Sequence, residues 1–276
     1  MYKMPVYLEG DNLMLIIKYQ VILILLLSIC STPCFGQAAD EGEISDSPAA
    51  HNKHRIDTTL TYVNSHEFDE FAGALGYTYS YSKHVNFSFG IPYLDSDLDG
   101  RGGSGIGDAS FVFAWSPHVD LDASPWIPKN VGSGIHLLIP TGNADDGRSL
   151  DSTIITPFLG FVYPIADSFF VLPSVGYAYS FDPTVTHGDI RILFAELGFL
   201  WNSASGFWVG FYPTWIRDYE SDDDHINYTV TVGKVFNNRW GLSFDLANME
   251  HFVPGKTPII DETLDTMIEV NLHFLF

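Results

Sequence analysis

Hydrophobic and polar residues alternate with a period of two through most of the chain after residue 54. This pattern is typical of strands with one apolar and one polar face, and the segments that carry it are bounded by Gly, Asp, Asn and Pro. Most segments have roughly the 9–11 residues that a tilted strand needs to cross a bilayer, and there are about twelve of them. The predicted strands are 55–64, 71–82, 84–93, 107–117, 131–140, 152–163, 168–180, 190–202, 206–217, 225–236, 239–248 and 264–276.

The last predicted strand, 264–276, shows the two faces clearly. Its apolar face carries Leu264, Ile268, Val270, Leu272, Phe274 and Phe276, and its polar face carries Asp265, Glu269, Asn271 and His273. In a transmembrane barrel the apolar face contacts lipid and the polar face lines the lumen. A soluble sheet shows the same alternation with water on the other side, so periodicity alone does not separate the two.

Composition and the C-terminus favour the membrane barrel. Aromatic residues make up 15% of the chain, many of them at strand ends as in interfacial girdles, and charged residues only 17%. The chain ends on Phe276, and a terminal Phe on an alternating strand is a feature that outer-membrane precursors present to the barrel-insertion machinery. We therefore predict an all-β, transmembrane, antiparallel up-and-down barrel of about twelve strands.

The connections predict the orientation of the barrel. Bacterial barrels have long extracellular loops, short periplasmic turns and both ends in the periplasm. This rule places the acidic loops outside and the turns SASG and NNR inside, while 117–129 is long for a periplasmic turn. Pro157, Pro173 and Pro213 fall within predicted strands, where each removes a ladder hydrogen bond and predicts a bulge or local irregularity.

The strongest apolar run, residues 21–29, follows Lys18 and is too short for a membrane-spanning helix. It is typical of a cleaved signal peptide, predicted here as 1–38 because Gly36 and Ala38 supply the small residues that a signal peptidase reads. Residues 39–54 are then a flexible leader, and Met14 is an alternative start.

A lipoprotein is the alternative for this segment, because Cys30 and Cys34 lie nearby. Lipid attachment needs a small residue just before the Cys, and Ile29 and Pro33 stand there instead, which disfavours it. Cleavage after residue 38 removes both cysteines, so disulfides and thiolate metal sites are excluded from the mature chain.

The chain is acidic, with 34 Asp+Glu against 13 Lys+Arg and a net charge of −21. Phosphate binding needs a basic face, so nucleic acid is excluded as a partner. No nucleotide motif appears, and no cofactor is expected.

Two short motifs lie at the ends of predicted strands. The stretch FSFGIPYLDSDLDGRGGSGIGDASFVFAW (87–115) contains Gly105, Gly107 and Asp108 as G-x-G-D, and LLIPTGNADDG (137–147) contains Pro140, Thr141 and Gly142. With FVLPSVGYAYSFD (170–182), these resemble the MetA-pathway of phenol degradation family of outer-membrane transporters, over residues 55–276. The resemblance implies a barrel associated with passage of aromatic or other hydrophobic compounds, although not phenol in particular.

Acidic residues supply the candidate sites in the loops. Asp95, Asp97 and Asp99 reproduce the first half of an EF-hand loop, but its twelfth position is Ile106 where a bidentate Glu is needed. An acidic surface loop is therefore favoured over a calcium site completed by Asp108. Residues 222–224 are three aspartates, for which a solvated loop is favoured over divalent-ion bridges to lipopolysaccharide phosphates.

Side chains alternate between the two faces of a strand, and this alternation predicts that four polar residues face the lumen: Glu196, Asp245, Glu269 and His273. A barrel of about twelve strands lies between the filled eight-stranded barrel and the open channel of 16–18, so these groups are candidates for a constriction. A polar network that only satisfies the lumen is an equal alternative.

The function predicted is passive diffusion of small hydrophobic or aromatic compounds across the outer membrane of a Gram-negative bacterium, among its lipids and lipopolysaccharide. A structural or adhesin-like barrel is the alternative. Outer-membrane phospholipases place His two residues before Ser on an outward strand. No Ser stands two positions after His66, His84, His136 or His187, so an enzyme is not expected.

Overall fold

The computed structural model describes residues 54–64, 69–82, 84–96, 103–116, 128, 130–143, 148–181, 189–220, 222–237, 239–252 and 265–276. The strands are β1 (His54–Asn64), β2 (Asp69–Ser82), β3 (Val85–Ser96), β4 (Ser104–Ile106), β5 (Ala109–Trp115), β6 (Asn130–Ile139), β7 (Thr153–Ala166), β8 (Phe169–Phe181), β9 (Arg191–Asn202), β10 (Phe207–Asp218), β11 (Asp223–Phe236), β12 (Trp240–Phe252) and β13 (Asp265–Leu275). The described residues contain no helix long and apolar enough to cross a membrane.

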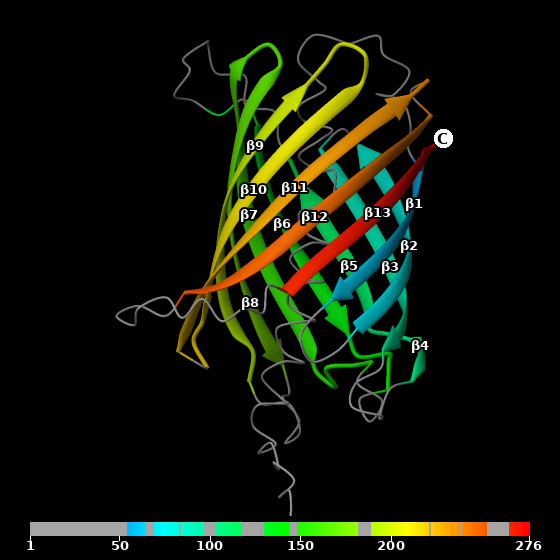
Figure 1. Cartoon of the computed structure of the whole chain (residues 1–276), viewed down its shortest axis with the longest axis vertical. Coiled ribbons are helices and arrows are strands. Elements are labelled where there is room, and N and C mark those ends of the chain that lie inside the picture. The colour runs from blue at the N-terminus through cyan, green and yellow to red at the C-terminus, as the bar shows by residue number, and fades with distance from the viewer. Residues whose placement is uncertain are drawn as a thin grey trace, which may run out of the picture.

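The strands form one antiparallel sheet that closes on itself. Neighbours along the chain pair except β4 with β5, β1 also pairs with β13, and the β2–β3 pairing closes the order. Figure 1 shows β13, in red, lying beside the blue β1. Because β4 and β5 both pair with β3, they count as one interrupted barrel strand. The predicted closed, twelve-strand, antiparallel barrel is confirmed.

Each predicted strand overlaps an observed one, with one difference. The predicted strand 107–117 begins two residues early: β5 starts at Ala109, and Gly107 and Asp108 lie between it and the short β4, which was not predicted. The Asp108 carboxylate binds backbone amides of a distant segment there, while Gly107 N still donates to Pro92 O of β3. The predicted signal peptide, the leader up to residue 53 and most of the connection 117–129 lie outside the described residues.

The three mid-strand prolines interrupt pairing without shifting the register. The β7–β8 ladder lacks pairs at Pro157 and again at Pro173, and the β9–β10 ladder lacks them at Pro213. A proline has no N–H to donate, which explains the local gaps. The register shifts occur elsewhere, between Ser80 and Ser82 and between Pro164 and Ala166.

The two faces of the barrel differ in exposure. Outward positions in mid-strand carry exposed apolar side chains, among them Leu75, Phe89, Leu197 and Leu246. Inward positions carry most of the buried polar groups. The turn at 203–206 and residue Arg239 lie at the same end as Phe276, as the orientation prediction requires, since Val235 N donates to Gly206 O and Leu275 N donates to Arg239 O.

The outward face makes a prediction for stability in a bilayer. Leu246, mid-strand on β12, is 52% exposed, so Leu246→Arg would place a charge in hydrocarbon and should lower the free energy of unfolding by about 2–4 kcal/mol. Lys234 is an outward charge near the end of β11, so Lys234→Leu should change it by less than about 1 kcal/mol. Urea titration from lipid bilayers measures both. Equal effects would contradict a lipid-facing belt.

Candidate functional site: the inner wall of the barrel

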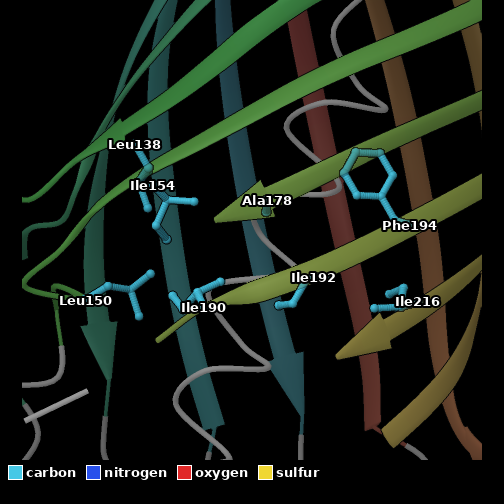
Figure 2. Packing of buried hydrophobic residues seen from close by; sticks show 8 residues of the cluster. All are labelled: Leu138, Leu150, Ile154, Ala178, Ile190, Ile192, Phe194 and Ile216. Atoms are coloured by element: carbon cyan, nitrogen blue, oxygen red, sulfur yellow. The ribbon is translucent and has the colours of Figure 1, made fainter. Parts of the chain in front are cut away.

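One part of the inner wall, formed by β6 to β10, is apolar. Its first cluster consists of Leu138, Leu150, Ile154, Ala178, Ile190, Ile192, Phe194 and Ile216 (Figure 2). A second cluster nearer the Phe276 end consists of Val162, Phe170, Leu172 and Leu200, with Trp208 and Tyr212 packed against it. We call these residues the apolar wall. The expectation of a polar inner face is wrong at these clusters, while polar side chains such as Thr156 and Thr214 lie on the same inner face.

Aromatic rings of the apolar wall lie against glycines on neighbouring strands. Gly176 is paired with Phe194, and a Cβ added at Gly176 would lie 2.1 Å from Phe194 Cζ. The same relation holds for Gly134 with Phe158, at 2.5 Å, and for Gly233 with Trp208, at 2.4 Å.

A fourth ring, that of Tyr212, covers Gly198, where an added Cβ would lie 2.8 Å from Tyr212 Cδ1. Glycine lets each ring lie close to the sheet. The rings therefore cover the wall instead of projecting across the barrel.

The facing part of the inner wall is polar, and most of its groups are bonded to one another. Asn271 on β13 donates through Nδ2 to Asp245 Oδ2 at 2.9 Å and to Glu269 Oε1 at 2.8 Å. Its Oδ1 accepts from Thr59 Oγ1 at 2.6 Å. Thr61 Oγ1 donates to Glu269 Oε2 at 3.3 Å. One amide thus links two carboxylates that are directly paired across β12 and β13.

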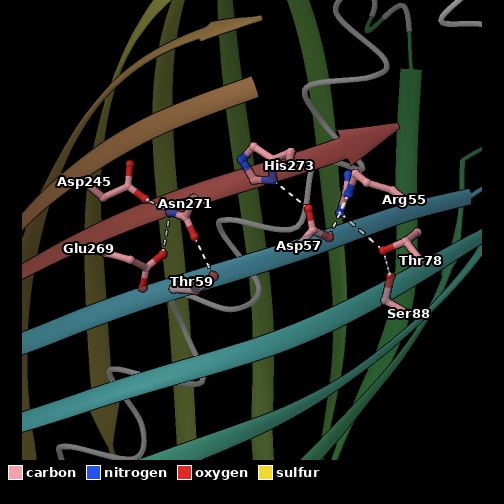
Figure 3. Close-up of polar contacts among 9 residues, drawn as sticks. All are labelled: Arg55, Asp57, Thr59, Thr78, Ser88, Asp245, Glu269, Asn271 and His273. Atoms are coloured by element: carbon pink, nitrogen blue, oxygen red, sulfur yellow. Dashed lines mark hydrogen bonds and ion pairs between the residues drawn. The ribbon is translucent and has the colours of Figure 1, made fainter. Parts of the chain in front are cut away.

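A second polar group lies nearer the chain ends (Figure 3). Asp57 accepts from Arg55 Nε at 2.8 Å and is bonded to His273 Nδ1 at 2.6 Å. Arg55 Nη2 donates to Thr78 Oγ1 at 3.3 Å, and Thr78 is bonded to Ser88 at 2.9 Å. We call this group and the Asn271 network the polar wall.

The structure places all four predicted lumen residues on the inside, in two places. Asp245, Glu269 and His273 lie together on the polar wall. Glu196 lies between the two apolar clusters, where Thr214 Oγ1 donates to it at 3.3 Å. Sequence reasoning missed Asp57, although its parity within 55–64 was available.

The residues of the two sequence motifs come together in space. The Asp108 carboxylate accepts from the backbone N–H groups of Thr141 and Gly142, each at 3.1 Å, and of Leu150 at 2.9 Å. Thr141 Oγ1 donates to Gly107 O at 2.8 Å and accepts from Ala109 N at 2.9 Å.

Gly105 and Gly142 are tight against Arg148, where an added Cβ would lie 1.9 Å from its side chain and 2.1 Å from its carbonyl oxygen. Pro140 directly follows Ile139, the last residue of β6. The motifs therefore hold the segment that carries Leu150 against the apolar wall, a structural role.

The acidic loop candidates gain no support. Asp95 is exposed on the outward face of β3, and Asp97 and Asp99 lie outside the described residues. No group of three or more His, Cys, Asp or Glu is placed to hold a metal ion within the described part of the chain. Asp222 and Asp224 both form ion pairs with Arg217, so the charge of the 222–224 run is partly neutralised.

No family model and no curated protein matches the chain. Solved outer-membrane porins match most of it. A KdgM porin in complex with disordered oligogalacturonate has a TM-score of 0.54 at 10% identity, covering 80% of this chain and 99% of that chain. The NanC porin has a TM-score of 0.55 at 7% identity, covering 79% and 98%.

The CymD monoaromatic hydrocarbon channel also matches, with a TM-score of 0.46 at 9% identity, covering 82% of this chain and 89% of that chain. That score is too low to bear on function. At these identities the likeness to the porins shows the fold alone, because one fold hosts many functions. The chain has the barrel fold of outer-membrane porins.

The contact between rings and glycines predicts an unequal response to added methyl groups. Gly176→Ala should displace the Phe194 ring and lower the free energy of unfolding by about 1–3 kcal/mol. Gly76→Ala is the matched inward control, because its nearest contact would be Asp57 Cβ at an ordinary 3.5 Å, and it should change stability by less than about 0.5 kcal/mol.

Urea titration in the same lipid measures both variants. In a Phe194→Ala background the cost of Gly176→Ala should shrink. An undiminished cost there would exclude the ring as its cause.

Proposed function

We propose that this protein is an outer-membrane channel through which small molecules with an apolar body and a polar group diffuse passively. The observation that carries the proposal is the division of the lumen into an apolar wall and a polar wall. A solute of this kind can keep its apolar surface against the rings of β7 to β10 while its polar group exchanges hydrogen bonds with the facing side chains. A uniformly polar lumen would favour sugars and ions instead.

The setting is part of the same proposal. The exposed apolar belt suits contact with the lipids of a Gram-negative outer membrane, with insertion through the C-terminal strand after removal of the signal peptide. Lipopolysaccharide would then surround the end of the barrel that carries β4. The resemblance to phenol-degradation transporters agrees with an amphipathic solute but does not identify one.

Solute flux tests the channel. Liposomes containing the purified barrel should admit 4-hydroxyphenyl β-glucoside faster than sucrose, a polar molecule of similar size that lacks an apolar ring. Light scattering follows the swelling, and protein-free liposomes supply the background rate. Equal entry of both solutes would favour an unselective pore. Entry of neither would favour the structural or adhesin-like barrel.

The polar wall also predicts ion selectivity. Its described inward charges are Asp57, Asp245 and Glu269 against Arg55, so acid is in excess and the channel should prefer cations. Glu269→Gln with Asp245→Asn should reduce that preference, seen as a smaller reversal potential under a KCl gradient in planar bilayers. Asp95→Asn, on the outward face, is the control and should leave it unchanged. An unaltered potential in the double variant would mean that the network is only structural.

A further inference from the structure

His136 on β6 is buried within the barrel. Its side chain is 1% exposed, between Val112 of β5 and Thr156 of β7. Neither ring nitrogen has a hydrogen-bond partner among the residues that the structure describes. Buried polar atoms are nearly always bonded in folded proteins, and an unbonded one often marks the place of a ligand or an ordered water.

His136 lines a cavity of about 170 Å³ between the polar wall and β3, β5 and β6. The polar side of the cavity is formed by Arg55, Asp57, Asn271 and His273, and apolar contacts come from Val112 and Leu138. Inward glycines on β2 and β3, Gly76 and Gly90, also line it. The space has room for several waters or for one compact organic molecule.

The hydrogen-bond partners around the cavity limit the charge of an occupant. Arg55 and Asp57 form an ion pair with each other, and Asp57 is also bonded to His273. Asp108 is bonded to three backbone amides. Arg148, which also lines the cavity, donates to Ile106 O at 3.5 Å. A charged solute would have to displace one of these partners, whereas the two ring nitrogens of His136 have no competing partner among the described residues.

We propose that this cavity is a binding site for an uncharged solute with a hydroxyl group and a compact apolar body, and that the hydroxyl group bonds to His136. In its uncharged form an imidazole has one donor and one acceptor nitrogen, and a hydroxyl can match either. Val112 and Leu138 contact the apolar body. This inference specifies the class of solute for the channel proposed above, and it rests on that proposed function.

Binding to the intact barrel in detergent tests the site, with cyclohexanol as the probe and methylcyclohexane as its counterpart of similar shape without a hydroxyl. Addition of cyclohexanol should shift the His136 side-chain ¹⁵N resonances saturably. His136→Phe, which keeps an apolar ring and should fold, should weaken cyclohexanol binding about fivefold, the worth of one hydrogen bond. It should not weaken binding of methylcyclohexane. His84→Phe, outside the cavity lining, is the matched control and should bind both as the wild type does.

Unchanged cyclohexanol binding in His136→Phe, or a wild-type spectrum that does not respond to cyclohexanol, would overturn the site and leave bound water as the partner of His136. The flux experiment separates this from the channel proposal. Entry of the phenyl glucoside with no response at His136 refutes the site alone. A saturable response at His136 without flux refutes the channel and keeps the site.

Discussion

β1 and β13 come from opposite ends of the chain and pair along their whole length, from Arg55 opposite Leu275 to Asn64 opposite Thr266. Two backbone hydrogen bonds between His54 and Phe276, at 3.1 and 3.0 Å, complete this seam. Without the seam, two strand edges would face hydrocarbon, where each unbonded backbone group costs several kcal/mol. The register of the seam also sets Asp57 opposite His273. Closing the barrel therefore assembles much of the polar wall in the same step.

The two walls are held by different contacts between neighbouring strands. On the polar wall, side chains from neighbouring strands bond to each other, so each position depends on the register of its neighbour. On the apolar wall, a ring on one strand needs a glycine on the next, as Phe194 needs Gly176. Both relations hold between neighbouring strands, so the residue pattern of a single strand does not reveal them. The asymmetry of the lumen is thus a property of the closed sheet.

This explains what sequence reasoning reached and what it missed. Alternation located every observed strand except the three-residue β4, and parity within β12 and β13 placed Asp245 and Glu269 inside. In β9 both faces are apolar, so parity could not reveal that its inner face joins the apolar wall. His136 stands in a similarly apolar run and gave no signal. The bonds of Asp108 reach residues 33 to 42 positions away, which no local pattern predicts.

Filling the interior of a barrel with buried charged groups costs desolvation free energy. Buried charged groups can often be replaced by packed apolar residues with no loss of stability, and sometimes with a gain. The apolar wall shows that this chain does build such packing in the same lumen. A barrel whose interior served stability alone would have no need of a bonded carboxylate network on one side and a cluster of aromatic rings on the other, with Glu196 as the carboxylate that lies among the apolar clusters. The proposed solute has two unlike surfaces and can stay in contact with both walls as it moves, and this is the physical argument that supports the proposal of passage.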